Sequence, residues 1–240
     1  MLKQDHSRFA VSPLVGLALL AAGCSSSRVT AQPRTESESP AANLYRDAGP
    51  NNLSPAVSAA LPRVYVPDVK SNDVYVIDPA TYRVVDHFKA GRHPQHIVPS
   101  WDLKTLWVAN NAGRGVRGSL TPIDPTTAKP GRPVPVEDPY NLYFTPDGIN
   151  AIVVAERHRR LDYLDPHTLR LKGSLATAKC GGINHADFAP DGSSAIFTVS
   201  LPEASSRSTF TTNGFSATSS SPAAECRRTS GPHPMDHHFW

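Results

Sequence analysis

Residues 74–79 read VYVIDP, and the pattern of a β-rich segment ending in Asp-Pro recurs as LTPIDP at residues 120–125 and LDYLDP at residues 161–166. A second landmark follows each copy: SWD at 100–102, PDG at 146–148 and PDG at 190–192. Short apolar segments come next, at residues 106–109, 151–154 and 195–198. The spacing of about 40 to 45 residues indicates a chain built from repeats of one supersecondary unit.

The aspartates of both landmarks are interpreted as turn residues. Asp bonds nearby backbone N–H groups, Pro presets φ and Gly accepts a positive φ, so the strands on either side can reverse tightly. The repeat itself explains why these carboxylates recur, and we therefore do not interpret them as acid/base pairs of an active site.

The strands between the landmarks alternate apolar and polar residues, as in YRVVDHF at residues 82–88, which suits an antiparallel blade covered by neighbours. The sequence resembles the YVTN-repeat β-propellers. The matching segments are residues 64–66, 77–78, 91–97 and 106–110, within a region from about Leu61 to Ser200. The resemblance implies an all-β propeller of four-stranded antiparallel blades, of which the chain holds about three where the family uses about seven.

The first 24 residues predict an exported lipoprotein. Lys3 and Arg8 precede an apolar stretch at residues 9–23 that is too short to span a bilayer stably, and the segment ends in LAAGC at residues 20–24. This end resembles a lipobox, which implies a signal peptide at 1–23 and a lipid on Cys24 that anchors the protein on the extracytoplasmic face of the cell membrane. The alternative is an ordinary cleaved signal with an incidental cysteine. Residues 24–60 are rich in Ser, Pro and Ala and predict a flexible tether.

Three polar residues occupy equivalent repeat positions: His96, Asn141 and His185. In propellers of this type the corresponding positions lie near one mouth of the central channel, so the three side chains are candidates to bind a metal ion or an anionic ligand, with His96 and His185 as the metal candidates. The alternative is that each side chain caps the start of its strand. The terminal His233, His237 and His238 would suggest a metal only if the end of the chain is native, and they are given no role. Cys180 is expected to be a lone thiol rather than the disulfide partner of Cys226.

Composition excludes several classes of function. The 240-residue chain has 24 basic and 21 acidic residues without a clustered basic patch, so nucleic acid is not the expected partner. No nucleophile–base arrangement or nucleotide fingerprint is present, and the sequence requires no cofactor. We therefore expect a binding scaffold for a small ligand or a protein rather than an enzyme.

Two alternatives to the scaffold remain. The resemblance extends to the haem-binding propellers of nitrite reductases, which implies a haem- or metal-binding oxidoreductase, although the sequence has no CxxCH haem-attachment site. The second alternative is that the chain as it stands is inert, because three blades leave open edges.

The repeat pattern stops after Val199, and residues 201–240 are Ser/Thr/Pro-rich. They predict either a disordered tail or the next blade translated in the wrong frame. Shifted by two nucleotides, codons for residues 202–211 permit GSLVKVDVH and codons for residues 225–236 permit MPQDVRTSPDG. The two landmark aspartates then fall about 43 and 44 residues after Asp165 and Asp191, where another repeat is due.

Sequencing the gene downstream of codon 199 tests the frameshift hypothesis. We expect further propeller repeats in the alternative frame. One uninterrupted frame with no propeller sequence in the other frames would refute the hypothesis.

Overall fold

A computed structural model describes residues 43–177, 180–199, 208–213 and 223–228, with the last two ranges described as backbone only. The predicted signal peptide, Cys24 and the terminal histidines lie outside these ranges. Within them, no helix is long and apolar enough to cross a membrane.

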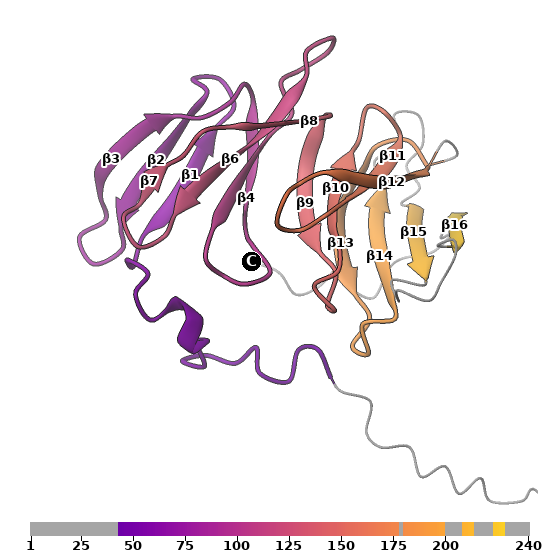
Figure 1. The fold of residues 1–240 in the computed structure, drawn as a ribbon, viewed down its shortest axis with the longest axis horizontal. Helices are drawn as coiled ribbons and strands as arrows, with labels where there is room; N and C mark the ends of the chain where they lie inside the picture. The colour runs from indigo at the N-terminus through magenta and orange to yellow at the C-terminus, as the bar shows by residue number, and fades with distance from the viewer. Residues whose placement is uncertain (1–42, 178–179, 200–207, 214–222, 229–240) are drawn as a thin grey trace, which may run out of the picture. The chain divides into compact units, whose positions relative to one another are not determined.

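The described chain forms four antiparallel sheets, which we name A to D in chain order (Figure 1). Sheet A contains β1 (Val64–Asp68), β2 (Asp73–Asp78) and β3 (Arg83–Lys89). Sheet B contains β4 (Pro94–Pro99), β5 (Leu106–Asn110), β6 (Gly118–Asp124), β7 (Lys129–Pro130) and β8 (Val134–Val136). Sheet C contains β9 (Pro139–Phe144), β10 (Ala151–Ala155), β11 (Arg160–Leu164) and β12 (Leu171–Ala176). Sheet D contains β13 (Ile183–Phe188), β14 (Ser194–Val199), β15 (Ser208–Asn213) and β16 (Ala223–Arg228).

The predicted fold class, an all-β propeller of four-stranded antiparallel blades, is confirmed. Sheets C and D have four strands in simple up-and-down order, and in sheet B the fourth strand is divided into β7 and β8, which both pair with β6. Sheet A begins one strand later than the others. β1 contacts β4, the first strand of sheet B, just as β5, the second strand of sheet B, contacts β9, the first strand of sheet C. The strands β1, β2 and β3 therefore correspond to the second, third and fourth strands of a blade.

The strand pattern continues beyond the predicted end of the repeats, where we expected no further strand. β15 pairs with β14 from Val199↔Ser208 to Ser194↔Asn213, and β16 pairs with β15. The sequence of β15, STFTTN, is rich in the β-branched and aromatic residue types that favour strands. Pairing with β15 also satisfies the backbone N–H and C=O groups along the edge of β14. The pattern of apolar residues in the sequence does not show this need for a partner strand.

The segment before the first strand also differs from the prediction of a flexible tether up to residue 60. The Leu44 N–H donates to the carbonyl of Pro190 at 2.6 Å, and the Tyr45 hydroxyl donates to the carbonyl of Phe188 at 2.9 Å. A short 3₁₀ turn, η1 (Pro55–Val57), follows, and the Leu61 N–H donates to the carbonyl of Pro125 at 2.8 Å. These bonds fix the segment on sheets B and D, and the rest of the predicted tether, residues 24–42, lies outside the described ranges.

The hydrophobic core lies between successive sheets. All five residues of β10 (AIVVA) are buried. Ile152 and Val154 pack in a cluster with residues of sheet D, whereas Ala151 and Val153 pack in a cluster with residues of sheet B. A smaller cluster around Val74, Val108 and Ile123 joins sheets A and B. Because every inner sheet is covered on both faces, no blade buries its apolar residues alone.

The landmark aspartates are turn residues, as predicted. The Asp124 carboxylate accepts hydrogen bonds from the hydroxyl and backbone N–H of Thr126, and these bonds lower the pKa of Asp124. Asp165 and Asp191 accept the same kinds of bond from Thr168 and Ser193, with the same effect on their pKa. Their oxygens serve to close reverse turns.

One inter-sheet contact lies at the second landmark. The indole of Trp101 lies against Gly148 in the PDG turn of sheet C, and its Nε1 donates to the carbonyl of Pro146 at 3.3 Å. Gly148 has a φ of +70°, and a Cβ built there would lie 2.5 Å from Cε2 of Trp101. This glycine is thus required by both its backbone conformation and its neighbour.

We expect the substitution Gly148→Ala to lower the free energy of unfolding by about 1 to 3 kcal/mol, because it adds the cost of a left-handed backbone to the displacement of Trp101. Gly173→Ala is the matched control, since Gly173 lies in β12 with open space around it. Urea denaturation of both variants measures the difference. Equal stability of the two variants would contradict the contact.

Candidate functional site

The first strands of sheets B, C and D begin in the same way. A residue with positive φ precedes each of them: His93 (50°), Asp138 (43°) and Gly182 (74°). A register shift then follows within the first residues of β4, β9 and β13, where each strand pairs with the next one in its sheet. Such bulges insert an extra residue and re-aim the side chains beside it. β9 contacts both β4 and β13, so the three re-aimed strand starts lie next to one another.

The structure brings two of the three predicted site residues together. The rings of His96, in β4, and His185, in β13, have their centroids 5.1 Å apart in an edge-to-face arrangement at 86°. Tyr140, at the start of the intervening strand β9, contacts both, with centroid distances of 5.2 Å to His96 and 6.1 Å to His185. We refer to His96, Tyr140 and His185 as the mouth cluster. Its residues come from three different sheets.

Asn141, the third predicted residue, occupies the equivalent register position but has another role. His96 pairs with Ala109 in β5, and Asn141 pairs with Val154 in β10. The Asn141 side chain is buried, donates to the hydroxyl of Tyr143 at 2.8 Å and accepts from the backbone N–H of Leu142 at 2.8 Å. The Tyr143 hydroxyl in turn accepts from the backbone N–H of Ala186 at 2.9 Å, which links sheets C and D. Asn141 therefore orders the strand starts and does not join the mouth cluster.

The electrostatic environment of the mouth cluster favours a neutral His96. Burial lowers the pKa of His96, and the neighbouring His185 lowers it further. The Nε2 atom of His96 is buried and has no hydrogen-bond partner among the described residues. Burial also raises the pKa of Tyr140, and the nearby Glu156 carboxylate adds to this effect. The pKa of Glu156 is itself raised, by burial and by the charge of Asp138, against the opposing effect of Arg157.

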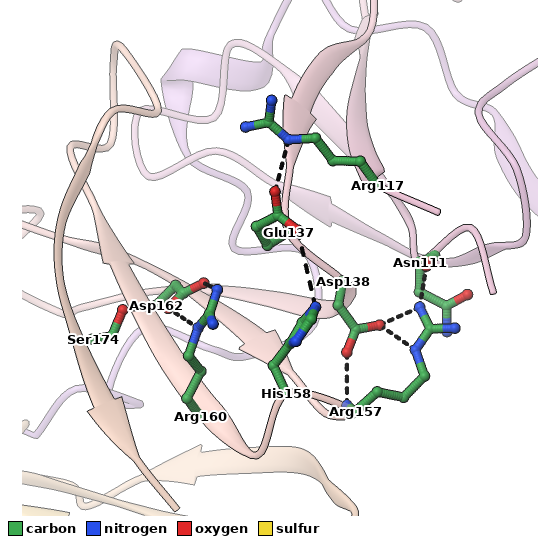
Figure 2. Close-up of polar contacts among 9 residues, drawn as sticks. All are labelled: Asn111, Arg117, Glu137, Asp138, Arg157, His158, Arg160, Asp162 and Ser174. Carbon is green, nitrogen blue, oxygen red and sulfur yellow. Dashed lines mark hydrogen bonds and ion pairs between the residues drawn. The ribbon is translucent and has the colours of Figure 1, made fainter. Parts of the chain in front are cut away.

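A buried ion pair holds the start of β9 (Figure 2). The Asp138 carboxylate accepts from both the backbone N–H and the Nε of Arg157, each at 2.6 Å, and also pairs with the Arg157 Nη2. The same Nη2 donates to the backbone carbonyl of Asn111, in the loop after β5. Arg157 thus ties the β10–β11 turn of sheet C to the loop of sheet B beside the mouth cluster.

Other charged residues near this pair are also engaged (Figure 2). Glu137 accepts from Arg117 at 2.9 Å, and its second oxygen lies 3.9 Å from Nε2 of His158. Asp162, buried in β11, accepts from Arg160 at 2.7 Å and from the hydroxyl of Ser174 at 2.5 Å. A groove of about 320 Å³ between β8 and sheet C is lined by Arg117, Glu137, Asp162 and Arg170 together with apolar residues. Arg117, Glu137 and Asp162 are already paired, and we assign no ligand to the groove.

The structure corrects the expectation for Cys180, which is buried and disulfide-bonded rather than a lone thiol. No group of three or more His, Cys, Asp or Glu side chains within the described ranges could hold a metal ion.

Sequence reasoning missed Tyr140 and the Asp138–Arg157 pair. Alignment of the repeats identifies one position per strand, whereas the bulge brings the neighbouring residue Tyr140 against the two histidine rings. The aromatic type of Tyr140 next to an aligned polar position is the signal that could have found it. Arg157 has no counterpart in the repeat landmarks, and only the folded turn shows its partner.

We expect Arg157→Met to lower the free energy of unfolding by about 3 to 5 kcal/mol, because it leaves the Asp138 carboxylate, with a side chain 2% exposed, buried without its partner. Arg46→Met is the control. It removes one member of an exposed pair, Arg46–Asp47, and should leave the free energy of unfolding nearly unchanged. Urea denaturation compares the two variants, and a loss of similar size in both would show that the buried pair is not a special restraint.

Comparison with known proteins agrees with this architecture. The chain resembles hydrazine synthase from Kuenenia stuttgartiensis, with a TM-score of 0.54 and 19% identity over 65% of this chain and 44% of that one. It also resembles proposed 6-phosphogluconolactonases from Bacteroides uniformis (TM-score 0.56, 16% identity) and Bacteroides fragilis (TM-score 0.54, 15% identity), each over 72% of this chain and 56% of the other. The chain thus spans about half the length of these solved structures, and at these identities the likeness concerns the fold alone. No curated protein matches the sequence significantly.

The family model of YNCE-like beta-propellers matches residues 42–201, which is more than half of the chain. The match begins where the described structure begins and covers the first three sheets with the first two strands of the fourth. The predicted resemblance to YVTN-type propellers is confirmed at this level, and the chain belongs to the YNCE-like β-propeller family.

Proposed function

We propose that this protein is a lipid-anchored propeller of the cell envelope that binds a small ligand or a protein at the mouth cluster. The observation that carries the proposal is the contact of the His96 and His185 rings with each other and with Tyr140. Through these contacts, three successive sheets direct ring side chains to one place. Ligand sites are commonly built from a few convergent polar groups on rigid strands. The LAAGC motif ending at Cys24 supports the anchor and, with it, the proposed location of the mouth cluster outside the cytoplasm.

The proposal is a binding function rather than catalysis. The mouth cluster offers aromatic surface and ring nitrogens, which suit recognition by stacking and hydrogen bonding. Glu156 and the arginine-fixed Asp138 add acidic groups beside it. The oxidoreductase alternative, with His96 and His185 handling a haem or a metal, uses the same residues. A Soret band in the full chain purified from its native membrane would favour that alternative over the scaffold.

Photo-crosslinking from the mouth cluster tests the proposed function. We expect p-benzoylphenylalanine in place of Tyr140 to form a defined adduct in cells, seen in the intact mass of the full chain. The same probe in place of Tyr82 is the control, because Tyr82 is 88% exposed in the β2–β3 turn. An adduct at Tyr82 alone, equal adducts at both positions, or none at position 140 would contradict binding at the mouth.

The same intact-mass measurement tests the anchor. The chain should start at Cys24 and carry the mass of a diacylglycerol group in the membrane fraction, and Cys24→Ser should lose both the lipid mass and the membrane location. A chain that starts elsewhere and remains unmodified would remove the anchor from the proposal.

A further inference from the structure

We propose that His96 and His185 together bind one divalent transition-metal ion of the Zn²⁺ class at the mouth cluster. This inference deepens the proposed function, on which it rests, by naming the chemical class of one ligand. It is carried by ring spacing, by the unpartnered ring nitrogen of His96, and by the way the backbone holds both residues.

The ring spacing suits two imidazoles bound to a common tetrahedral ion. With zinc–nitrogen bonds of about 2.05 Å, the centroid of each ring lies about 3.2 Å from the ion, and a tetrahedral angle then separates the two centroids by about 5.2 Å. The observed separation is 5.1 Å, and the rings are inclined by 86°. Little movement of the two centroids is needed for both rings to reach one ion.

The ring of His96 has a nitrogen available for coordination. Its Nε2 is buried without a hydrogen-bond partner among the described residues. A buried polar atom without a partner costs free energy, and a metal–ligand bond would remove that cost. Burial also lowers the pKa of His96, and the neutral ring is the form that coordinates metals.

Both residues are held in place by the fold rather than by the ligand. The backbone N–H of His185 donates to Oδ1 of Asn184 at 2.8 Å and to Oγ1 of Thr198 at 3.2 Å. His96 lies in the bulge of β4 and its ring packs edge-to-face against Tyr140. Rings that are positioned before binding lose little conformational freedom when the ion arrives. Two protein ligands leave two tetrahedral positions for water or another ligand.

Calorimetric titration of the full chain, in detergent, with ZnCl₂ tests this site. The terminal His233, His237 and His238 are replaced by Gln in every sample, so that they cannot compete for the metal. We expect one equivalent of Zn²⁺ to bind, and His96→Ala and His185→Ala each to weaken binding at least tenfold. His167→Ala is the control, because His167 is exposed in the β11–β12 turn, and it should bind as the parent does.

A second measurement protects the test from variants that fail to fold. In the parent chain with ¹⁵N-labelled histidine, Zn²⁺ should shift the ring nitrogens of His96 and His185 together at one equivalent. Absence of binding, a shift confined to one of the two rings, or undiminished affinity in both alanine variants would overturn the proposal. The adduct at position 140 does not require metal, so its persistence without Zn²⁺ binding would retain the proposed function and reject the metal alone.

Discussion

The structure depends on how the first strand of each blade begins. A residue with positive φ turns the chain, and a bulge then shifts the register before regular pairing starts. The arrangement occurs three times with different residues in the turning position, His93, Asp138 and Gly182, so the backbone conformation is retained where the side chain is not. Two of these residues bear the cost of a left-handed backbone. As a result, ring side chains from the starts of β4, β9 and β13 come together in the mouth cluster.

Packing between the sheets positions the residues of the mouth cluster. The mouth cluster draws one ring from each of sheets B, C and D, so its geometry is only as precise as the contacts between the sheets. Those contacts are apolar in the interior, where β10 is covered on both faces. Near the mouth cluster, Arg157 makes polar contacts between the sheets. At the opposite ends of the first strands, Trp101 makes an aromatic contact between sheets. The segment at residues 43–62 adds bonds to the carbonyls of Pro190 and Pro125.

Much of this was predictable because it repeats. The Asp-Pro and PDG landmarks identify the turns, and their order identifies the family and the equivalence of His96, Asn141 and His185. What the repeat could not show is which neighbour each position meets. Asn141 lies in register with the two histidines yet bonds to Tyr143, whereas Tyr140, one residue away, contacts both histidine rings. β15 and the segment around Tyr45 were missed for a related reason: their partners are distant in sequence, and neither carries a landmark.

The folded blades bring His96 and His185 into direct contact with each other beside Tyr140. Nuclear Overhauser measurements on the full chain, with histidine as the only protonated residue type, test it without any ligand or substitution. We expect a cross-peak between the ring protons of His96 and His185, since the ring centroids are 5.1 Å apart. Well-resolved resonances for both rings with no cross-peak between them would contradict it.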